Sequence, residues 1–109
     1  MNLAEPTGDD LVAVLAALAN PQRLRVIAAL ADRRDYVSSL ARELGISRPL
    51  LQIHLRKLEA AGLVSATVEV SEDGKAMKFY EVTPFTLTLT PELVRTAAKT
   101  VTVADRARP

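Results

Sequence analysis

The sequence contains no cysteine at all. This absence excludes disulfides, thiolate metal sites, a cysteine nucleophile and thiol redox sensing. It contains one histidine, His54, and a single histidine cannot build a tetrahedral metal site without partner ligands. The sequence also lacks a phosphate-cradling glycine-rich loop and a paired arrangement of serine, histidine and acid. We therefore predict a protein that is not an enzyme and that carries neither a metal nor a cofactor.

Long hydrophobic runs are missing as well. The longest unbroken apolar run, Leu11 to Ala19, has nine residues, whereas a membrane-spanning helix needs about 20. The residues before this run include Glu5, Asp9 and Asp10 and no base, which is the wrong flank for a signal peptide. We expect no membrane segment, and the absence of cysteine favours a cytoplasmic location for the protein.

The charge is small overall but unevenly distributed. The 109 residues are 49% apolar and 25% charged, which is enough for the core of one domain. The net charge is only +1, yet residues 20–60 contain eight bases and four acids. Residues 46–58 contain Arg48, Arg56 and Lys57 and no acid. Such a segment can bind a polyanion, although a solvated charged face is the alternative interpretation.

Apolar residues at helical spacing predict two helices in the first third of the chain. Thr7 is suited to cap the first helix, which should end at Leu18 because Asn20 precedes Pro21 and is pushed out of the helical region. The same Asn20 should cap the second helix. The expected buried stripes are Leu11, Val14, Leu15 and Leu18 in the first helix, and Leu24, Ile27, Ala28 and Ala31 in the second.

The middle of the chain predicts a helix-turn-helix followed by a hairpin. A helix over residues 37–44 should end at Gly45, and Ser47 should cap a longer helix with Leu51, Leu55 and Leu58 inward. An ordinary corner between two helices is the alternative. From residue 63 the apolar period changes to two, so strands over residues 64–70 and 76–82 should meet at a turn at residues 73–74. Residues 85–90 should be extended, a last helix should follow over about 92–101, and the tail from about residue 104 should fray.

Three segments resemble the ArsR-type winged helix-turn-helix regulators: residues 18–27 (LANPQRLRVI), 40–47 (LARELGIS) and 54–64 (HLRKLEAAGLV). The resemblance runs from about residue 11 to residue 82. It implies an α+β, mostly α, winged helix-turn-helix fold with about five helices and one β-hairpin wing, in a single domain over residues 1–109. It further implies a homodimer built by the terminal helices, about 10–18 and 92–101.

The same resemblance implies a sequence-specific DNA-binding transcriptional regulator. Such a protein is usually a repressor that leaves a pseudo-palindromic operator on double-stranded DNA when an inducer binds, here an unidentified small molecule. Many members sense metals through a Cys-x-Cys pair at the start of the third helix, where this chain has Tyr36 and Ser38. The last helix has no histidine, and Glu92 is its single acid. We therefore expect a regulator without a thiolate metal site.

The residues expected at DNA lie in the fourth helix and the wing. Arg48, Gln52 and Arg56 recur every four residues opposite the leucine stripe, and Arg and Gln match the edges of guanine and adenine. A solubilising helix face is the alternative, and Ile53 fits core-edge packing as well as a thymine methyl. The predicted DNA-binding set is Ser47, Arg48, Pro49, Gln52, Ile53, Arg56, Lys75 and Lys78.

Two further interpretations concern neighbouring residues. His54 is expected to be packed and hydrogen-bonded rather than to read bases, and Arg23 and Arg25 are expected to form ion pairs with nearby acids. Leu50 and Ile53 keep open a second function, a winged helix that docks proteins and does not read DNA, because such a module more often carries an apolar patch on this face.

Overall fold

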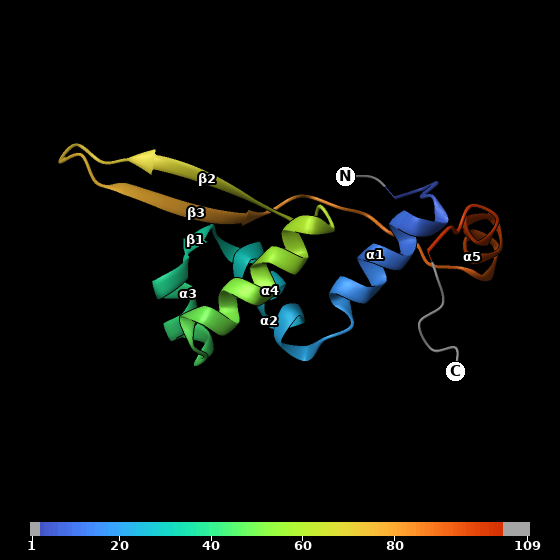
Figure 1. The fold of residues 1–109 in the computed structure, drawn as a ribbon, viewed down its shortest axis with the longest axis horizontal. Coiled ribbons are helices and arrows are strands. Elements are labelled where there is room, and N and C mark those ends of the chain that lie inside the picture. Colours follow the sequence, from blue (N-terminus) through green and yellow to red (C-terminus); the bar gives the residue numbers. More distant parts are fainter. Residues whose placement is uncertain (1–2, 104–109) are drawn as a thin grey trace.

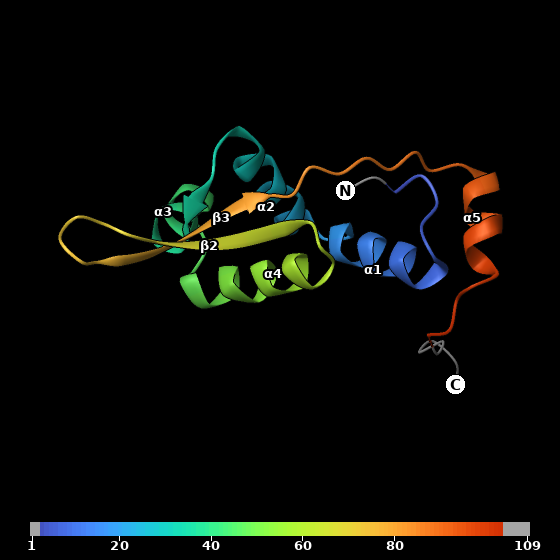
Figure 2. The ribbon, with the colours of Figure 1, turned by 90° about the horizontal axis from the view of Figure 1, so that it is seen from above.

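The wing and the last helix lie at opposite ends of an elongated molecule, 52 × 31 × 21 Å in extent (Figures 1 and 2). The structure, a computed structural model, describes residues 3–103. The fraying expected from about residue 104 lies outside these residues. The described elements, in chain order, are α1 (Gly8–Leu18), α2 (Pro21–Asp32), β1 (Asp35–Tyr36), α3 (Val37–Leu44), α4 (Arg48–Ala60), β2 (Val64–Val70), β3 (Ala76–Val82) and α5 (Pro91–Ala98).

The predicted helix caps are confirmed. Thr7 Oγ1 accepts a hydrogen bond from the backbone N–H of Asp10 (3.1 Å) at the start of α1. Asn20 Oδ1 accepts from the N–H groups of Gln22 and Arg23, at 2.9 and 3.1 Å, at the start of α2. Between α3 and α4, Gly45 has a φ of 67°, a left-handed conformation that favours glycine. These local signals set the helix boundaries, as the sequence predicts.

The core forms where α2, α3 and α4 meet the root of the wing. The predicted inward stripe of α4, Leu51, Leu55 and Leu58, is fully buried. Leu40 of α3 packs against it, and Tyr80 and Val64 close the core from the sheet, with 2% and 3% of their surface exposed. The helix-turn-helix is therefore held by a continuous apolar cluster, which leaves the outer side of α4 free.

The predicted buried stripe of α2 is wrong except for Ile27, which is partly buried and packs against the core. Val26 and Leu30 are the buried residues of this helix, whereas Leu24 is 54% exposed and Ala28 and Ala31 are exposed. Residues 26–31 are all apolar, so two stripes fit the periodicity equally well. The same ambiguity affects α1. Ala17 is buried there, whereas Leu15, which was expected to point inward, is 38% exposed.

The sheet has one strand more than the predicted hairpin. The β2 and β3 strands pair antiparallel from Val64↔Val82 to Val70↔Ala76, as expected. The short β1 adds to the free edge of β3 through Asp35↔Tyr80 and Tyr36↔Phe79, giving the order β1-β3-β2. The sequence does not predict this strand, because a strand of two residues has no periodicity to detect.

The C-terminal segment returns along α1. Residues 83–90 run extended past α1 (Figure 2), and Leu3 N–H donates to the carbonyl oxygen of Thr86 (2.8 Å). Thr90 Oγ1 caps α5 by accepting from the N–H of Leu93 (3.1 Å). The helix ends at Ala98, three residues before the expected boundary. Within residues 3–103, each helix by itself is too short or too polar to cross a bilayer. Taken together, α1 and α2 have the length and composition of a membrane span, but they are bent by 91° at the break between them.

Candidate nucleic-acid interface

The outer side of α4 presents the predicted polar row. Ser47 lies at the start of the helix, where its Oγ accepts from the N–H of Leu50 (3.2 Å). Arg48 and Arg56 are exposed. Gln52, which lies between them in the sequence, is partly buried. Ile53 is 43% exposed, so part of its side chain is open to a ligand, and both alternatives for it stay open. The helix therefore separates a buried leucine stripe from an exposed face that carries two arginines and a glutamine.

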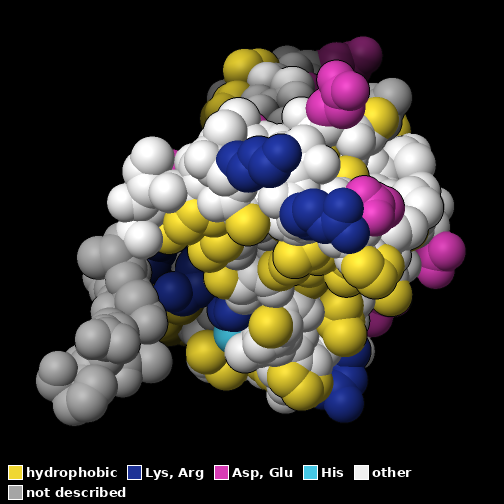
Figure 3. Space-filling view, turned by 90° about the vertical axis from the view of Figure 1, so that its right-hand side faces the viewer, with side chains coloured by type: hydrophobic (Ala, Val, Ile, Leu, Met, Phe, Trp, Pro, Cys, Tyr) yellow, Lys and Arg dark blue, Asp and Glu magenta, His cyan; other side chains and the backbone are white. Residues whose placement is uncertain are grey.

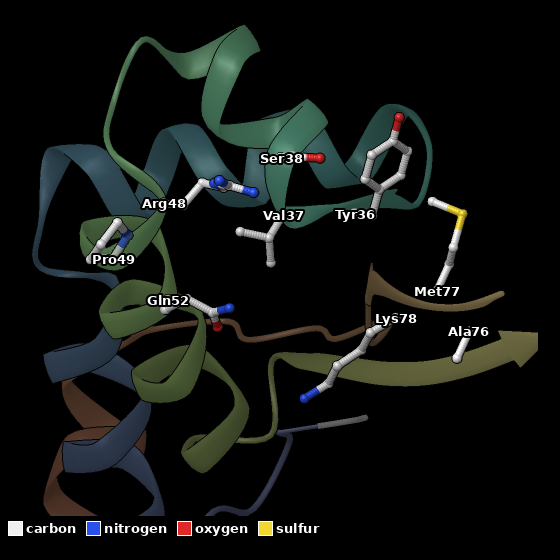
Figure 4. Close-up of a pocket in the computed structure, with 9 residues that line it drawn as sticks. All are labelled: Tyr36, Val37, Ser38, Arg48, Pro49, Gln52, Ala76, Met77 and Lys78. Carbon is white, nitrogen blue, oxygen red and sulfur yellow. The ribbon is translucent and has the colours of Figure 1, made fainter.

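A cleft of about 620 Å³ separates this face from the wing (Figure 4). It brings together four residues of the predicted DNA-binding set: Arg48, Pro49 and Gln52 from α4, and Lys78 from β3. The side chains of Lys78 and Gln52 point into the space between the strand and the helix (Figure 4). The remaining lining residues are Tyr36, Val37, Ser38, Ala76 and Met77. The lining contains two cations and no acid, so the cleft suits a negatively charged ligand such as a nucleic-acid backbone.

The other four residues of the set lie outside this lining. Ile53 and Arg56 belong to α4, Ser47 is the N-cap of that helix, and Lys75 lies at the tip of the wing. The N–H of Lys75 donates to Ser71 Oγ (3.2 Å), which fixes the turn and leaves the lysine side chain exposed. In the same turn the hydroxyl of Ser71 donates to the carboxylate of Asp73 and lowers the pKa of that group. A charged Asp73 therefore stays next to Lys75 at neutral pH.

One face of the wing carries both apolar and charged side chains, and it continues the cleft. Side chains alternate along a strand, so the register places Val68, Val70 and Lys78 on the same face. Val68 and Val70 are 61% and 69% exposed. The Lys78 Nζ lies 5.3 Å from the centre of the Tyr80 ring, a cation–π distance that draws the lysine toward the body of the protein.

Within residues 3–103, the basic residues of this surface have no acidic partner in an ion pair. In the part of the chain that the structure describes, the ion pairs are Arg34–Glu69 and Arg95–Glu92. The cations of the predicted set are therefore not neutralised by ion pairs with the described residues. Cations of this kind can instead contact phosphates or base edges.

The prediction for Arg23 is wrong, because it bonds to backbone carbonyls rather than to an acid. Its Nε donates to the carbonyl oxygen of Ala17 (2.6 Å) and its Nη2 to that of Ala16 (3.3 Å) at the end of α1. A cation at a helix C-terminus offsets the partial negative charge there. The ion pair predicted for Arg25 is likewise not found among residues 3–103.

The prediction that His54 is packed is confirmed. Its side chain is 6% exposed, and its Nδ1 lies 3.4 Å from Nη1 of Arg23. Burial lowers the pKa of His54, and the charges of Arg23 and Lys57 lower it further. The imidazole is therefore neutral at physiological pH and faces the interior rather than the outer side of α4.

The positions that hold thiolates in many ArsR-type regulators open onto the cleft. Tyr36 and Ser38 line it, and neither is a thiol. Among residues 3–103 there is no group of three or more His, Asp or Glu side chains placed to hold a metal ion.

The terminal helices meet at the end of the molecule that lies far from the wing. Gly8 N–H donates to Thr100 Oγ1 (2.7 Å), and the carboxylate of Asp9 accepts from the N–H of Thr102 (2.7 Å). Figure 3 views this end and shows hydrophobic side chains gathered across its face. The exposed large apolar residues of α1 and of the segment around α5 are Val12, Leu15, Leu89, Val94, Val101 and Val103.

Comparison with known proteins identifies relatives of this chain. The arsR family of bacterial regulatory proteins matches residues 20–66. An uncharacterized HTH-type transcriptional regulator of Methanocaldococcus jannaschii is 35% identical over 86 residues, which is 79% of this chain and 90% of that protein. The HTH-type transcriptional regulator CmtR of Mycobacterium tuberculosis is 45% identical over 53 residues, which is 49% of this chain and 45% of CmtR.

Solved structures share the fold over most of the chain. The homodimeric winged helix-turn-helix DNA-binding domain Mb0332 of Mycobacterium bovis is 25% identical, with a TM-score of 0.61 over 84% of this chain and 74% of that one. HlyU of Vibrio cholerae is 26% identical, with a TM-score of 0.60 over 84% and 87% of the two chains. The predicted winged helix-turn-helix fold is thereby confirmed, and the alternative of a protein-docking module is not favoured.

Proposed function

The chain belongs to the ArsR family of bacterial regulatory proteins and is a DNA-binding regulator of transcription, and we propose that it is a homodimeric, cytoplasmic repressor without a thiolate metal site. Each subunit lays α4 into a major groove of a pseudo-palindromic operator. An inducer, a small molecule that remains to be identified, releases the dimer from DNA. The whole chain acts as one domain, with α1 and α5 serving the dimer.

The observation that carries the DNA-binding mode is the outer face of α4. Arg48, Gln52 and Arg56 share this face, and Arg48 and Gln52 also line the cleft. Arginine pairs with guanine and glutamine with adenine in the major groove, so these residues are assigned to base reading. Ser47 and Pro49, at the start of the helix, are assigned to the flanking phosphate, and Ile53 to a thymine methyl.

The wing is assigned to the phosphate backbone. Lys78 approaches the cleft from β3, and Lys75 extends from the tip of the hairpin. Phosphate contacts fix the register of a protein on DNA but carry no sequence information. The two lysines should therefore contribute affinity to every DNA sequence alike.

The exposed apolar end supports the dimer. A monomer would leave Val94, Val12 and Leu15 in water on adjoining helices, whereas a two-fold contact buries them. A two-fold axis through this end places the two copies of α4 side by side on one face of DNA. The half-sites are then about one helical turn, roughly 34–36 Å, apart.

Selection of bound fragments from genomic DNA, followed by titration, tests this function. On the selected site we expect Arg48→Ala or Gln52→Ala to cost about 1–3 kcal/mol, and less on random DNA. Arg25→Ala, which removes the same charge from an exposed position on α2, is the matched control and should leave the discrimination between the two DNAs unchanged. Equal losses on both DNAs, with folding intact, would mean that neither residue reads bases.

The sign of regulation needs a second experiment. A reporter gene placed behind the selected site should be silenced by the protein and restored by the Gln52→Ala variant. Activation of the reporter by the protein would overturn the assignment as a repressor while leaving DNA binding in place.

A further inference from the structure

We propose that Arg34 and Glu69 form a clamp that positions the wing for DNA, an inference that rests on the proposed contact between the wing and phosphates. The clamp ties the segment between α2 and β1 to the outer half of the hairpin. It acts on DNA only through the wing, and neither residue is assigned a contact with DNA.

The outer half of the hairpin has little other support. The β1 strand pairs only with Tyr80 and Phe79, near the root. Beyond Thr67 every residue of β2 is exposed, and so are the first three residues of β3. A two-stranded hairpin by itself is at best marginally stable in water. A contact from the body of the protein to this part of the wing therefore determines how firmly the wing is held.

Arg34 supplies that contact with two bonds and a stack. Its Nη1 and Nη2 lie 2.5 Å and 3.0 Å from the Oε2 and Oε1 atoms of Glu69, a bidentate pair. The same guanidinium lies 4.3 Å from the centre of the Phe79 ring. The Tyr36 ring meets Phe79 edge-on, with centroids 5.9 Å apart and planes at 88°. A planar guanidinium can satisfy a carboxylate fork and an aromatic face at once, which a lysine cannot do.

The register places the clamp on the face of the hairpin opposite Lys78. Glu69 pairs with Met77 and Val68 pairs with Lys78, so the two pairs point to opposite faces of the hairpin. The clamp therefore leaves Lys78 free. Lys78 borders the cleft from one face and Met77 from the other, so a fixed hairpin holds Lys78 beside α4. About half of each charged side chain is solvent-exposed, so the clamp should affect the wing's orientation more than the stability of the fold.

The negative charge of Glu69 lets the direction of the change in DNA affinity distinguish a positioning role from an electrostatic one. A carboxylate on the wing repels the phosphate backbone, so removing it should tighten DNA binding if its effect is electrostatic alone. If the clamp positions the wing, Glu69→Gln weakens binding in spite of the lost repulsion. We expect a loss of about two- to fivefold on both specific and random DNA, the range that an exposed ion pair supports.

Glu81→Gln is the matched control. Glu81 pairs with Ser65, which puts it on the same face of the same hairpin as Glu69, and its carboxylate is exposed. The charge of Glu81 also acts on Arg34 from a distance and raises the pKa of Arg34, but Glu81 makes no hydrogen bond to Arg34 that the structure records among residues 3–103. Glu81→Gln therefore removes the same charge and leaves the hydrogen-bonded fork in place. Binding by Glu81→Gln should be unchanged or slightly tighter. Equal behaviour of the two variants would overturn the clamp.

A spectroscopic measurement separates positioning from a general loss of structure. Because the chain has no cysteine, Glu72→Cys creates a single site at the wing tip for a nitroxide label. We expect the label to be more mobile by electron paramagnetic resonance in the Glu69→Gln background than in the Glu81→Gln background. Arg34→Lys, which keeps the charge but loses the fork, should also raise mobility. Weaker DNA binding with unchanged mobility would overturn the proposal.

Two lysine variants distinguish failure of the clamp from failure of the wing contact. Lys75→Ala and Lys78→Ala are titrated against DNA at several salt concentrations alongside the clamp variants. If neither changes the salt dependence, the wing does not touch DNA, and both the contact and its positioning are overturned. If either lysine variant changes the salt dependence while Glu69→Gln binds DNA as tightly as Glu81→Gln, the clamp alone is overturned.

Discussion

Arg23 places its Nη1 3.4 Å from Nδ1 of His54 while its other nitrogens bind the carbonyl oxygens of Ala16 and Ala17. One side chain of α2 thus joins the end of α1 to the buried side of α4. Any change in the charge of His54 is felt at this junction, because a protonated imidazole next to a guanidinium is repulsive. The helix that is assigned to DNA is linked in this way to the helix that is assigned to the dimer.

We expect the protein to lose stability as the pH falls below neutrality. Burial and the neighbouring cations lower the pKa of folded His54 below its ordinary value of 6.5. The unfolded chain then binds a proton that the folded chain does not, so the free energy of unfolding falls as the pH drops from about 6.5 towards the folded pKa. Thermal unfolding between pH 8 and pH 5 should show this decline in the wild type.

His54→Gln removes the titrating group and should flatten the pH dependence over the same interval. The carboxylates of Asp9 and Glu69 also have lowered pKa values, because each accepts hydrogen bonds, from Thr102 and Arg34 respectively. Their contribution to stability is complete above their ordinary pKa values and is lost only in more acidic solution. An equal decline in wild type and variant between pH 8 and pH 5 would assign the effect to another group.

Gly8 permits a close approach that a larger residue would prevent. A Cβ at this position would overlap the carbonyl oxygen of Ala97 and the Cγ2 of Val101, and would lie 2.8 Å from the backbone nitrogen of Val101. We expect Gly8→Ala to cost about 1–3 kcal/mol in the free energy of unfolding, because α5 must shift away from α1. Denaturant unfolding measures this loss. Asp10→Ala, an exposed change in the same turn, should cost less than about 1 kcal/mol.

The caps and the helix-turn-helix could be predicted because their signals are local. Asn20, Gly45 and Ser47 each act on residues within a few positions, so composition and spacing are enough to place them. The leucine stripe of α4 is equally clear, because Leu51, Leu55 and Leu58 recur at helical spacing and are fully buried.

The remaining features depend on contacts between residues far apart in the chain. The phase of α2 could not be derived because its apolar residues fit two stripes, and the inward face includes Arg23, which bonds to α1 and approaches α4. The Arg34–Glu69 pair joins residues 35 positions apart, with no spacing rule to connect them. The cleft likewise follows from where the wing lies relative to α4.

The apolar end should fail to dimerise when a charge is placed on it. Val94 is 45% exposed on α5, and a carboxylate there would be buried without a partner in a two-fold contact. We expect Val94→Glu to weaken self-association by about tenfold or more. Sedimentation at tens of micromolar is the measurement. Val70→Glu is the matched control, since this valine is exposed on the wing, and its dimer should persist.

A monomeric wild type under the same conditions would contradict the dimer itself. If Val94→Glu remained dimeric with its fold intact, the interface would not involve this face of α5. Leu24, which is exposed on α2, would then be the next apolar position to substitute.

We expect no tight binding of zinc, because residues 3–103 contain no cluster of three or more ligating side chains and the chain has no thiol. Calorimetric titration with zinc, with and without operator DNA, is the measurement. Stoichiometric sub-micromolar binding that lowers DNA affinity would contradict the proposal of a regulator without a metal site.

The lysines of the wing should control the salt dependence of DNA binding. Each phosphate that the protein neutralises steepens the fall of log K with log salt by about 0.9, and a dimer uses each lysine twice. Lys75→Ala should therefore flatten the slope by roughly 2, or nearer 1 if the carboxylates of Glu72 and Asp73 already offset part of its charge. The loss of affinity should be equal on specific and random DNA, unlike that of Arg48→Ala.

Lys78 differs from Lys75 in its surroundings, and this difference sharpens the test. Its Nζ lies 5.3 Å from the Tyr80 ring and it lines the cleft beside α4, so a phosphate seated there would contact it directly. Lys78→Arg keeps the charge and should retain the wild-type slope, whereas Lys78→Ala should lose about as much slope as Lys75→Ala. An unchanged slope in both alanine variants, with the specific site still bound, would restrict the interface to α4 and leave the hairpin without a role on DNA.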